Sequence, residues 1–102
     1  MEKLIKDGKV AVLVSPGFGA GWSTWNSENR EALAFDKDIA QAVLDGNMAL
    51  AAKIGEDRYE AYSGGVEDLV VEWVPQGAAF EIEEYDGSET LHVIGERRYM
   101  VA

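Results

Sequence analysis

Apolar and polar residues alternate along this 102-residue chain in short blocks that predict strands near both ends and helices in the middle. Near the N-terminus, the predicted strands Lys3–Lys6 and Lys9–Ser15 flank Asp7-Gly8, a dipeptide typical of hairpin turns. The run from Val10 to Val14 is apolar at every position. It therefore predicts a central strand that is covered on both faces.

Two short helices are predicted next. Asp36 is a suitable N-cap for a helix over residues 37–45, and Gly46 is well placed to end it. Asn47 caps a second helix over residues 48–54, which Gly55 is expected to close. Because only Asp45-Gly46-Asn47 joins them, the helices should form a compact pair. The preceding residues, 27–33, show only a weak helical pattern.

After a connector over residues 58–65, the chain predicts more strands. In the strand over residues 67–74, alternation places Leu69, Val71 and Trp73 on one face. The next strand, over residues 79–85, should turn Phe80 and Ile82 inward. The Asp86-Gly87 turn leads to a strand over residues 90–94, and a last short strand is predicted at residues 98–101.

The order ββ-αα-βββ predicts an α+β fold with an antiparallel β-sheet and two short helices packed on one face. The length fits a single domain over residues 1–102. With 47% apolar and 27% charged residues, the composition is that of a globular protein. The absence of cysteine excludes disulfides, thiolate chemistry and cysteine-ligated zinc.

The net charge of −10 is unevenly distributed. Residues 1–35 carry four basic and four acidic residues, whereas residues 36–102 carry five basic and fifteen acidic residues. Direct nucleic-acid binding is disfavoured by this charge, and a basic protein partner is favoured. With no apolar run long enough to span a bilayer and no signal-peptide core, we expect a soluble cytoplasmic protein.

The segment Ser15–Asn26 is the strongest candidate for a binding site. Its glycines would let the backbone approach a ligand and offer amides to an anion, while Trp22 and Trp25 would stack on it. Known phosphate motifs do not fit, because Trp22 stands where a dinucleotide motif needs glycine or alanine and the segment lacks a P-loop lysine. The alternative is a tight loop whose tryptophans fill the core. The candidate ligand-binding residues are Ser15, Gly17, Phe18, Gly19, Gly21, Trp22, Ser23, Thr24, Trp25 and Asn26.

Catalytic and metal-binding patterns are weak. His92 is the only histidine and lies mid-strand, and no nucleophile-elbow sequence is present. A second aromatic–glycine cluster contains Tyr59, Tyr62 and Gly64-Gly65, and Arg97-Arg98 is the only basic pair of the acidic part. The acidic residues that could bind a metal, without EF-hand spacing, are Glu81, Glu83, Glu84 and Asp86. We therefore expect no enzyme activity, metal or cofactor.

Residues 9–26, with residues 71–75 and 80–87, resemble a family of small tailed-bacteriophage proteins to which no activity is attached. The resemblance covers nearly the whole chain, and residues 9–26 are its most specific part. It implies a setting, the infected bacterial cytoplasm. Small phage proteins there bind host defence components, sequester cyclic nucleotide signals or imitate nucleic-acid charge.

Two hypotheses follow. The first is a non-catalytic protein that sequesters a small nucleotide-like ligand, such as a cyclic nucleotide, through residues 15–26. The alternative is an acidic interaction module that inhibits a basic host protein as a nucleic-acid mimic. Because three tryptophans and four tyrosines leave aromatic surface that a lone domain would not cover, we also expect a homo-oligomer, most simply a dimer.

Overall fold

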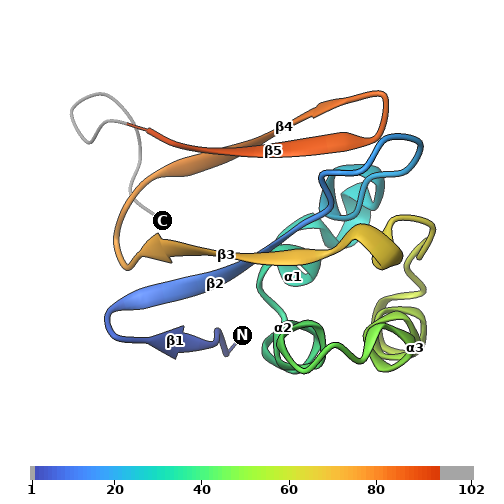
Figure 1. Ribbon diagram of the computed structural model, residues 1–102, viewed down its shortest axis with the longest axis horizontal. Helices are drawn as coiled ribbons and strands as arrows, with labels where there is room; N and C mark the ends of the chain where they lie inside the picture. The colour runs from blue at the N-terminus through green and yellow to red at the C-terminus, as the bar shows by residue number, and fades with distance from the viewer. Residues whose placement is uncertain (1, 95–102) are drawn as a thin grey trace.

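The computed structural model describes residues 2–94, which form an α+β fold in three layers (Figure 1). The middle layer is an antiparallel sheet of β1 (Ile5–Lys6), β2 (Lys9–Val14) and β3 (Val70–Pro75), with β2 in the centre. A second sheet lies above it in Figure 1 and contains only β4 (Phe80–Tyr85) and β5 (Ser88–Val93). The predicted α+β class is confirmed.

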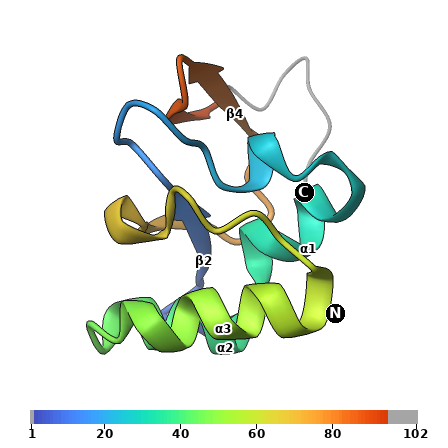
Figure 2. The same ribbon diagram turned by 90° about the vertical axis from the view of Figure 1, so that its right-hand side faces the viewer.

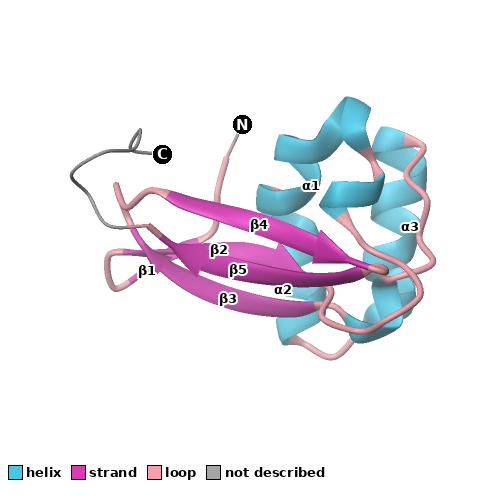
Figure 3. Ribbon diagram, turned by 90° about the horizontal axis from the view of Figure 1, so that it is seen from above, coloured by secondary structure: helices cyan, strands magenta, loops and turns pink. Residues whose placement is uncertain are grey.

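The division into two sheets corrects the expectation of one sheet. After β3 the chain turns sharply at Gly77, which has a positive φ of 87°. The β4–β5 hairpin then folds over the β1–β2–β3 sheet instead of extending it (Figure 3). This arrangement packs Phe80, Ile82 and Leu91 against the valines of β2. The hairpin thus covers the second face of the β1–β2–β3 sheet instead of adding strands to its edge.

Strand β2 is covered on both faces, as its apolar run predicts. Ala11 and Leu13 belong to the core cluster on the helix side, whereas Val10, Val12 and Val14 belong to the cluster under the hairpin. Four of the five residues are completely inaccessible, and Val10 is only 8% exposed. Both sets of side chains are buried because successive residues of a strand face opposite sides and β2 has a packed layer on each side.

The helix pair consists of α2 (Lys37–Leu44) and α3 (Met48–Tyr59), which lie below the β1–β2–β3 sheet (Figure 1). Both predicted N-caps are present. The Asp36 carboxylate accepts hydrogen bonds from the amides of Asp38 and Ile39, each at 2.9 Å, and the Asn47 side chain accepts one from Leu50 at 3.1 Å. Gly46, with a positive φ of 75°, follows the end of α2 as expected.

Gly55 does not close the second helix, so that prediction was wrong. The helix continues to Tyr59, and Glu60 ends it in the left-handed conformation with a φ of 52°. Gly55 is buried, and a β-carbon there would lie 2.9 Å from Cη2 of Trp22. The glycine therefore makes room for a tryptophan ring, and the predicted connector over residues 58–65 starts only after Tyr59.

Additional helical turns occupy segments that the sequence predicts as loop, only weakly as helix or, at residues 67–68, as the start of a strand. These turns are the short 3₁₀ helices η1 (Ser23–Trp25), η2 (Ser27–Asn29) and η3 (Val66–Asp68). Because η3 takes up the start of the predicted strand, β3 begins at Val70 instead of Glu67. Helix α1 (Arg30–Phe35) buries its last three residues consecutively, which explains its weak periodicity.

The predicted strand over residues 98–101 lies outside the described residues. Within residues 2–94, no helix has the length and apolarity needed to cross a membrane.

Candidate functional site

The segment Ser15–Asn26 crosses one end of the molecule. Figure 2 shows this end, where the loop after β2, the chain after α3 and the tip of the β4–β5 hairpin lie close together. The amide of Gly19 donates a 2.8 Å hydrogen bond to the carbonyl of Asp86 in the hairpin tip. The Ser15 hydroxyl donates one of 2.9 Å to the carbonyl of Gly65. The two aromatic–glycine clusters of the sequence are therefore neighbours in space.

A buried carboxylate, that of Glu89 on β5, holds the loop. Its oxygens accept hydrogen bonds from the backbone amides of Ser15 at 2.9 Å, Trp22 at 2.7 Å and Thr24 at 3.1 Å. The Thr24 hydroxyl adds a fourth bond of 2.6 Å. Glu89 is only 1% exposed, and none of the ion pairs among residues 2–94 includes it. Backbone dipoles and one hydroxyl thus stabilise this charge without a cation.

The glycines of the loop region allow close approach between parts of the same chain. A β-carbon on Gly65 would lie 2.7 Å from the carbonyl oxygen of Gly21 and 2.8 Å from that of Ala20. A β-carbon on Gly87 would collide with the backbone of Gly19 and Ala20. Close approach of backbone to glycine does occur, at Gly65 and Gly87. The amides that surround an anion, however, are those of Ser15, Trp22 and Thr24 instead of those of the loop glycines, and the anion is the side chain of Glu89.

The two tryptophans have different environments. Trp22 is completely buried, its indole nitrogen donates a 2.9 Å hydrogen bond to the carbonyl of Leu33, and its ring faces Gly55. No face of Trp22 is open to a ligand in this conformation. Trp25 is 42% exposed and stacks on Tyr62, with ring centroids 6.0 Å apart and ring planes 21° from parallel.

Asn26 fixes the position of the Trp25–Tyr62 pair. Its side-chain oxygen accepts a 2.7 Å hydrogen bond from the amide of Tyr62, and its nitrogen donates to the carbonyls of Trp22 at 2.8 Å and Tyr62 at 3.2 Å. All three bonds join the short side chain of Asn26 to backbone groups, so the pair is held in place although Trp25 is 42% and Tyr62 55% exposed.

Four exposed aromatic side chains lie on the three segments that meet at this end, and we call them the aromatic end. Phe18 is 72% exposed and precedes Gly19, whereas Tyr85 is 79% exposed and precedes Asp86, the hydrogen-bond partner of Gly19. Trp25 and Tyr62 complete the set. Exposed aromatic side chains on a well-fixed backbone are typical of binding surfaces.

The other predicted site residues lie between the core and this surface. Ser23 is completely buried, and its hydroxyl has no hydrogen-bond partner among the described residues. Gly21 is buried as well, while Gly17 is partly exposed beside the side chain of Asp68. The segment therefore divides into a buried half that organises the backbone and an exposed half that consists mainly of Phe18 and Trp25.

A polar network positions the C-terminal end of α3 beside this surface. The Asp36 carboxylate accepts hydrogen bonds from the Tyr59 hydroxyl at 2.5 Å and from Arg58 at 3.0 Å. Burial alone would raise the pKa of Asp36, but hydrogen bonds from Tyr59, the Ile39 amide and Arg58 hold it below its ordinary value. Burial and the adjacent carboxylate raise the pKa of Tyr59 to about 12.

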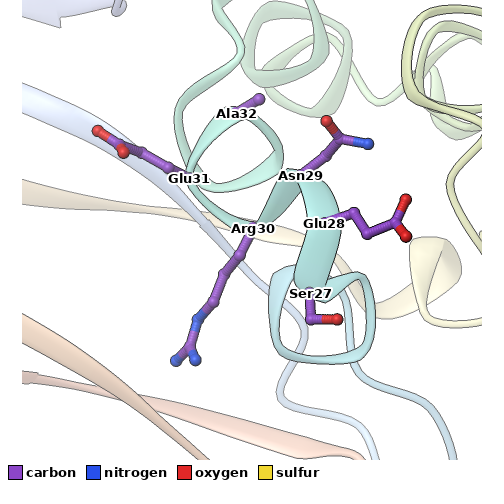
Figure 4. Close-up of a pocket in the computed structure, with 6 residues that line it drawn as sticks. All are labelled: Ser27, Glu28, Asn29, Arg30, Glu31 and Ala32. Atoms are coloured by element: carbon purple, nitrogen blue, oxygen red, sulfur yellow. The ribbon is translucent and has the colours of Figure 1, made fainter.

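A hollow of about 630 Å³ lies over η2 and α1 but has no convergent chemistry. Figure 4 shows that the side chains lining it point away from one another. Arg30 extends toward β4, where it donates a 3.3 Å hydrogen bond to the carbonyl of Ile82, and Glu31 points to the opposite side from Glu28. This hollow is therefore an open surface around a short helix.

His92 and the carboxylates of the hairpin lie apart from the aromatic end. His92 is on the outer face of the β4–β5 hairpin, where its Nε2 lies 3.7 Å from Oε1 of Glu83. Within the described residues, no group of three or more histidine or acidic side chains lies close enough together to hold a metal ion.

Besides Tyr85 of the aromatic end, the residue that the sequence analysis missed is Glu89. Strand alternation contains a signal for it, because Glu89, Leu91 and Val93 occupy every second position and Leu91 packs inward. Comparison of the chain with protein-family models, curated proteins and solved structures finds no match in any of the three.

Proposed function

We propose that this protein is a non-catalytic binding protein that holds a basic protein partner on its aromatic end. The observation that supports this proposal best is that the loop over residues 15–26 has a buried half and an exposed half. Its inward amides are bonded to Glu89, while Phe18, Trp25, Tyr62 and Tyr85 remain exposed on the neighbouring segments. Aromatic side chains of this kind contribute most of the binding energy in many protein interfaces.

Charge favours a protein partner over a nucleotide. A chain with a net charge of −10 attracts a basic surface and repels phosphate at long range. A nucleotide would also need amides or cations for its phosphates, and the amides of Ser15, Trp22 and Thr24 already donate to Glu89. The sequestering of a nucleotide therefore stays a prediction that this geometry favours less than the acidic interaction module.

The resemblance to small bacteriophage proteins supplies the setting of the proposal. The partner would be a basic protein of the bacterial cytoplasm, for example one that binds nucleic acid, and occupation of its basic surface would inhibit it. No reaction is required for such a role. The expected homodimer stays a prediction as well, and it would use the same exposed rings.

Affinity isolation from bacterial lysate tests this proposal when it is combined with matched variants. Trp25→Ala/Tyr62→Ala removes the stacked pair, and Leu50→Ala is the control, because Leu50 on α3 is 43% exposed, much as Trp25 is at 42%. We expect a basic protein to be enriched by the wild-type protein and by Leu50→Ala, but not by the double variant. Raising the salt to about 0.5 M should weaken the complex through charge screening.

Two results would contradict the proposal. Equal recovery of every basic protein by the wild-type protein and the double variant would exclude the aromatic end as the binding surface. Native mass spectrometry that finds a retained nucleotide, with no protein partner, would instead support ligand sequestration. Light scattering separates self-association from both, because a dimer of two copies with a charge of −10 should strengthen as salt rises.

A further inference from the structure

A hollow of about 260 Å³ lies directly beside the Trp25–Tyr62 stack, between the η1–η2 segment and the C-terminal end of α3. It is smaller than the hollow over η2 and α1, but residues from two distant parts of the chain line it. They are Trp25, Asn26, Ser27, Glu28, Asn29, Tyr59 and Glu60.

The charge in this hollow is negative. Two carboxylates, those of Glu28 and Glu60, belong to its lining, which contains no lysine or arginine. Neither carboxylate forms an ion pair with another residue of the described range 2–94. The hollow also lies at the C-terminus of the twelve-residue helix α3, where the helix dipole adds negative partial charge.

The lining is held in place by contacts that do not use up the carboxylates. Asn29 donates a 3.2 Å hydrogen bond to the carbonyl of Tyr59, which joins the two walls. The Tyr59 hydroxyl is fixed by Asp36, and Asn26 is fixed by the backbone of Tyr62. Glu60 stands at the left-handed residue that ends α3, so the chain reverses there. The site is thus organised, and its acidic side chains remain available to bind a cation.

We propose that this hollow receives an arginine side chain of the basic protein partner, an inference that rests on the function proposed above. A guanidinium has five N–H donors in one plane, which suits a lining that offers oxygen acceptors from two segments of the chain. The exposed ring of Trp25 on the rim offers a surface for the guanidinium plane or the aliphatic stem. A lysine ammonium, as a compact point charge, would use fewer of these acceptors.

Titration with a small probe tests the site without knowledge of the partner. The probe is N-acetyl-arginine N-methylamide, and the neutral citrulline analogue is its matched control. We expect saturable changes in the amide NMR signals of residues 25–29 and 59–60 and in the indole signal of Trp25 with the arginine probe, and none with citrulline. The lysine analogue should bind more weakly.

Charge variants separate this site from the general acidity of the protein. Glu28→Gln/Glu60→Gln should weaken binding of the arginine probe by about three- to tenfold, as expected for the loss of two exposed charge pairs. The control, Glu81→Gln/Glu83→Gln, removes the same charge from the outer face of the hairpin and should leave the affinity unchanged within about twofold. Equal weakening by both variants, or signal changes spread over the whole acidic surface, would overturn the proposal.

The same variants distinguish failure of this inference from failure of the proposed function. If Glu28→Gln/Glu60→Gln still captures the basic partner as well as the wild-type protein does, the partner binds elsewhere on the aromatic end and the arginine site is wrong. If the probe binds at the hollow but no basic protein depends on Trp25 and Tyr62, the arginine site is real as a cation site and the proposed partner is wrong.

Discussion

The carboxylate of Glu89 lies 2.7 Å from the backbone nitrogen of Trp22, so a side chain of β5 is an acceptor for the loop that follows β2. The same carboxylate accepts from the amides of Ser15 and Thr24. One buried carboxylate therefore holds the backbone of the segment that carries Phe18 and Trp25. Stability and recognition are linked through this residue.

Replacing Glu89 should destabilise the whole protein. In Glu89→Ala, three buried or partly buried amides lose their acceptor, so we expect the free energy of unfolding to fall by about 3 kcal/mol or more. Glu81→Gln, on the exposed outer face of the same hairpin, is the control and should change it by less than about 0.5 kcal/mol. Urea unfolding measures both. Equal stabilities would mean that the loop does not depend on the carboxylate.

Alanine variants of the two tryptophans should behave differently. Trp22→Ala removes a completely buried ring and should cost about 3–5 kcal/mol of stability. Trp25→Ala removes a ring that is 42% exposed and stacks only on Tyr62, so it should cost about 1 kcal/mol. Thermal unfolding of both variants, followed by circular dichroism, provides the comparison. A larger loss for Trp25→Ala would show that the assignment of core and surface rings is reversed.

Gly55→Ala should destabilise the protein, although alanine is favoured over glycine in an isolated helix by about 1 kcal/mol. The added methyl group would lie 2.9 Å from the Trp22 ring, and overpacking of this kind costs about 1–3 kcal/mol. In a Trp22→Phe background the same change should cost less, because the smaller ring leaves space. A double-mutant cycle from urea unfolding measures this coupling. Additive effects would show that the methyl group and the ring do not meet.

Asp36 should make the protein sensitive to acid. Its pKa is lowered in the folded protein from an ordinary value of 3.8, so its stabilisation is fully present above the unfolded pKa and is lost as the pH falls through the folded value. Asp36→Asn cannot ionise but still caps a helix, so its stability should decline less steeply than that of wild type below about pH 5. Unfolding free energies at several pH values measure the two slopes. Parallel slopes would contradict the assignment.

Local sequence signals predicted the features that depend on neighbouring residues. Asp36 and Asn47 are N-caps, and Asp7-Gly8 and Asp86-Gly87 are hairpin turns in which both residues have positive φ. These conformations follow from short-range sterics and hydrogen bonding. The apolar run of β2 was equally informative, because only a strand between two layers can bury every side chain.

Features that depend on distant residues could not be predicted from local patterns. Gly55 has the sequence context of a helix end, and only the ring of Trp22, which is 33 positions earlier in the sequence, explains why the helix continues. Glu89 lies one residue outside the predicted strand, so its inward direction was not recognised. The sequence favoured an anion at the amides of the loop glycines, whereas the amides that bind one belong to Ser15, Trp22 and Thr24, and the anion is a side chain from 65 or more positions later in the same chain.

The bond between Ser15 and Glu89 also affects the order in which the protein folds. The two residues are separated by 74 positions, so the ribosome completes Ser15 long before the acceptor of its amide exists. The helix pair and the β1–β2 turn need only local contacts and can form early, whereas the loop that carries Phe18 and Trp25 has to wait for β5. During synthesis the loop therefore cannot reach its final hydrogen-bonded form before residue 89 has been added, and a chain that stalls earlier lacks the carboxylate that holds the aromatic end.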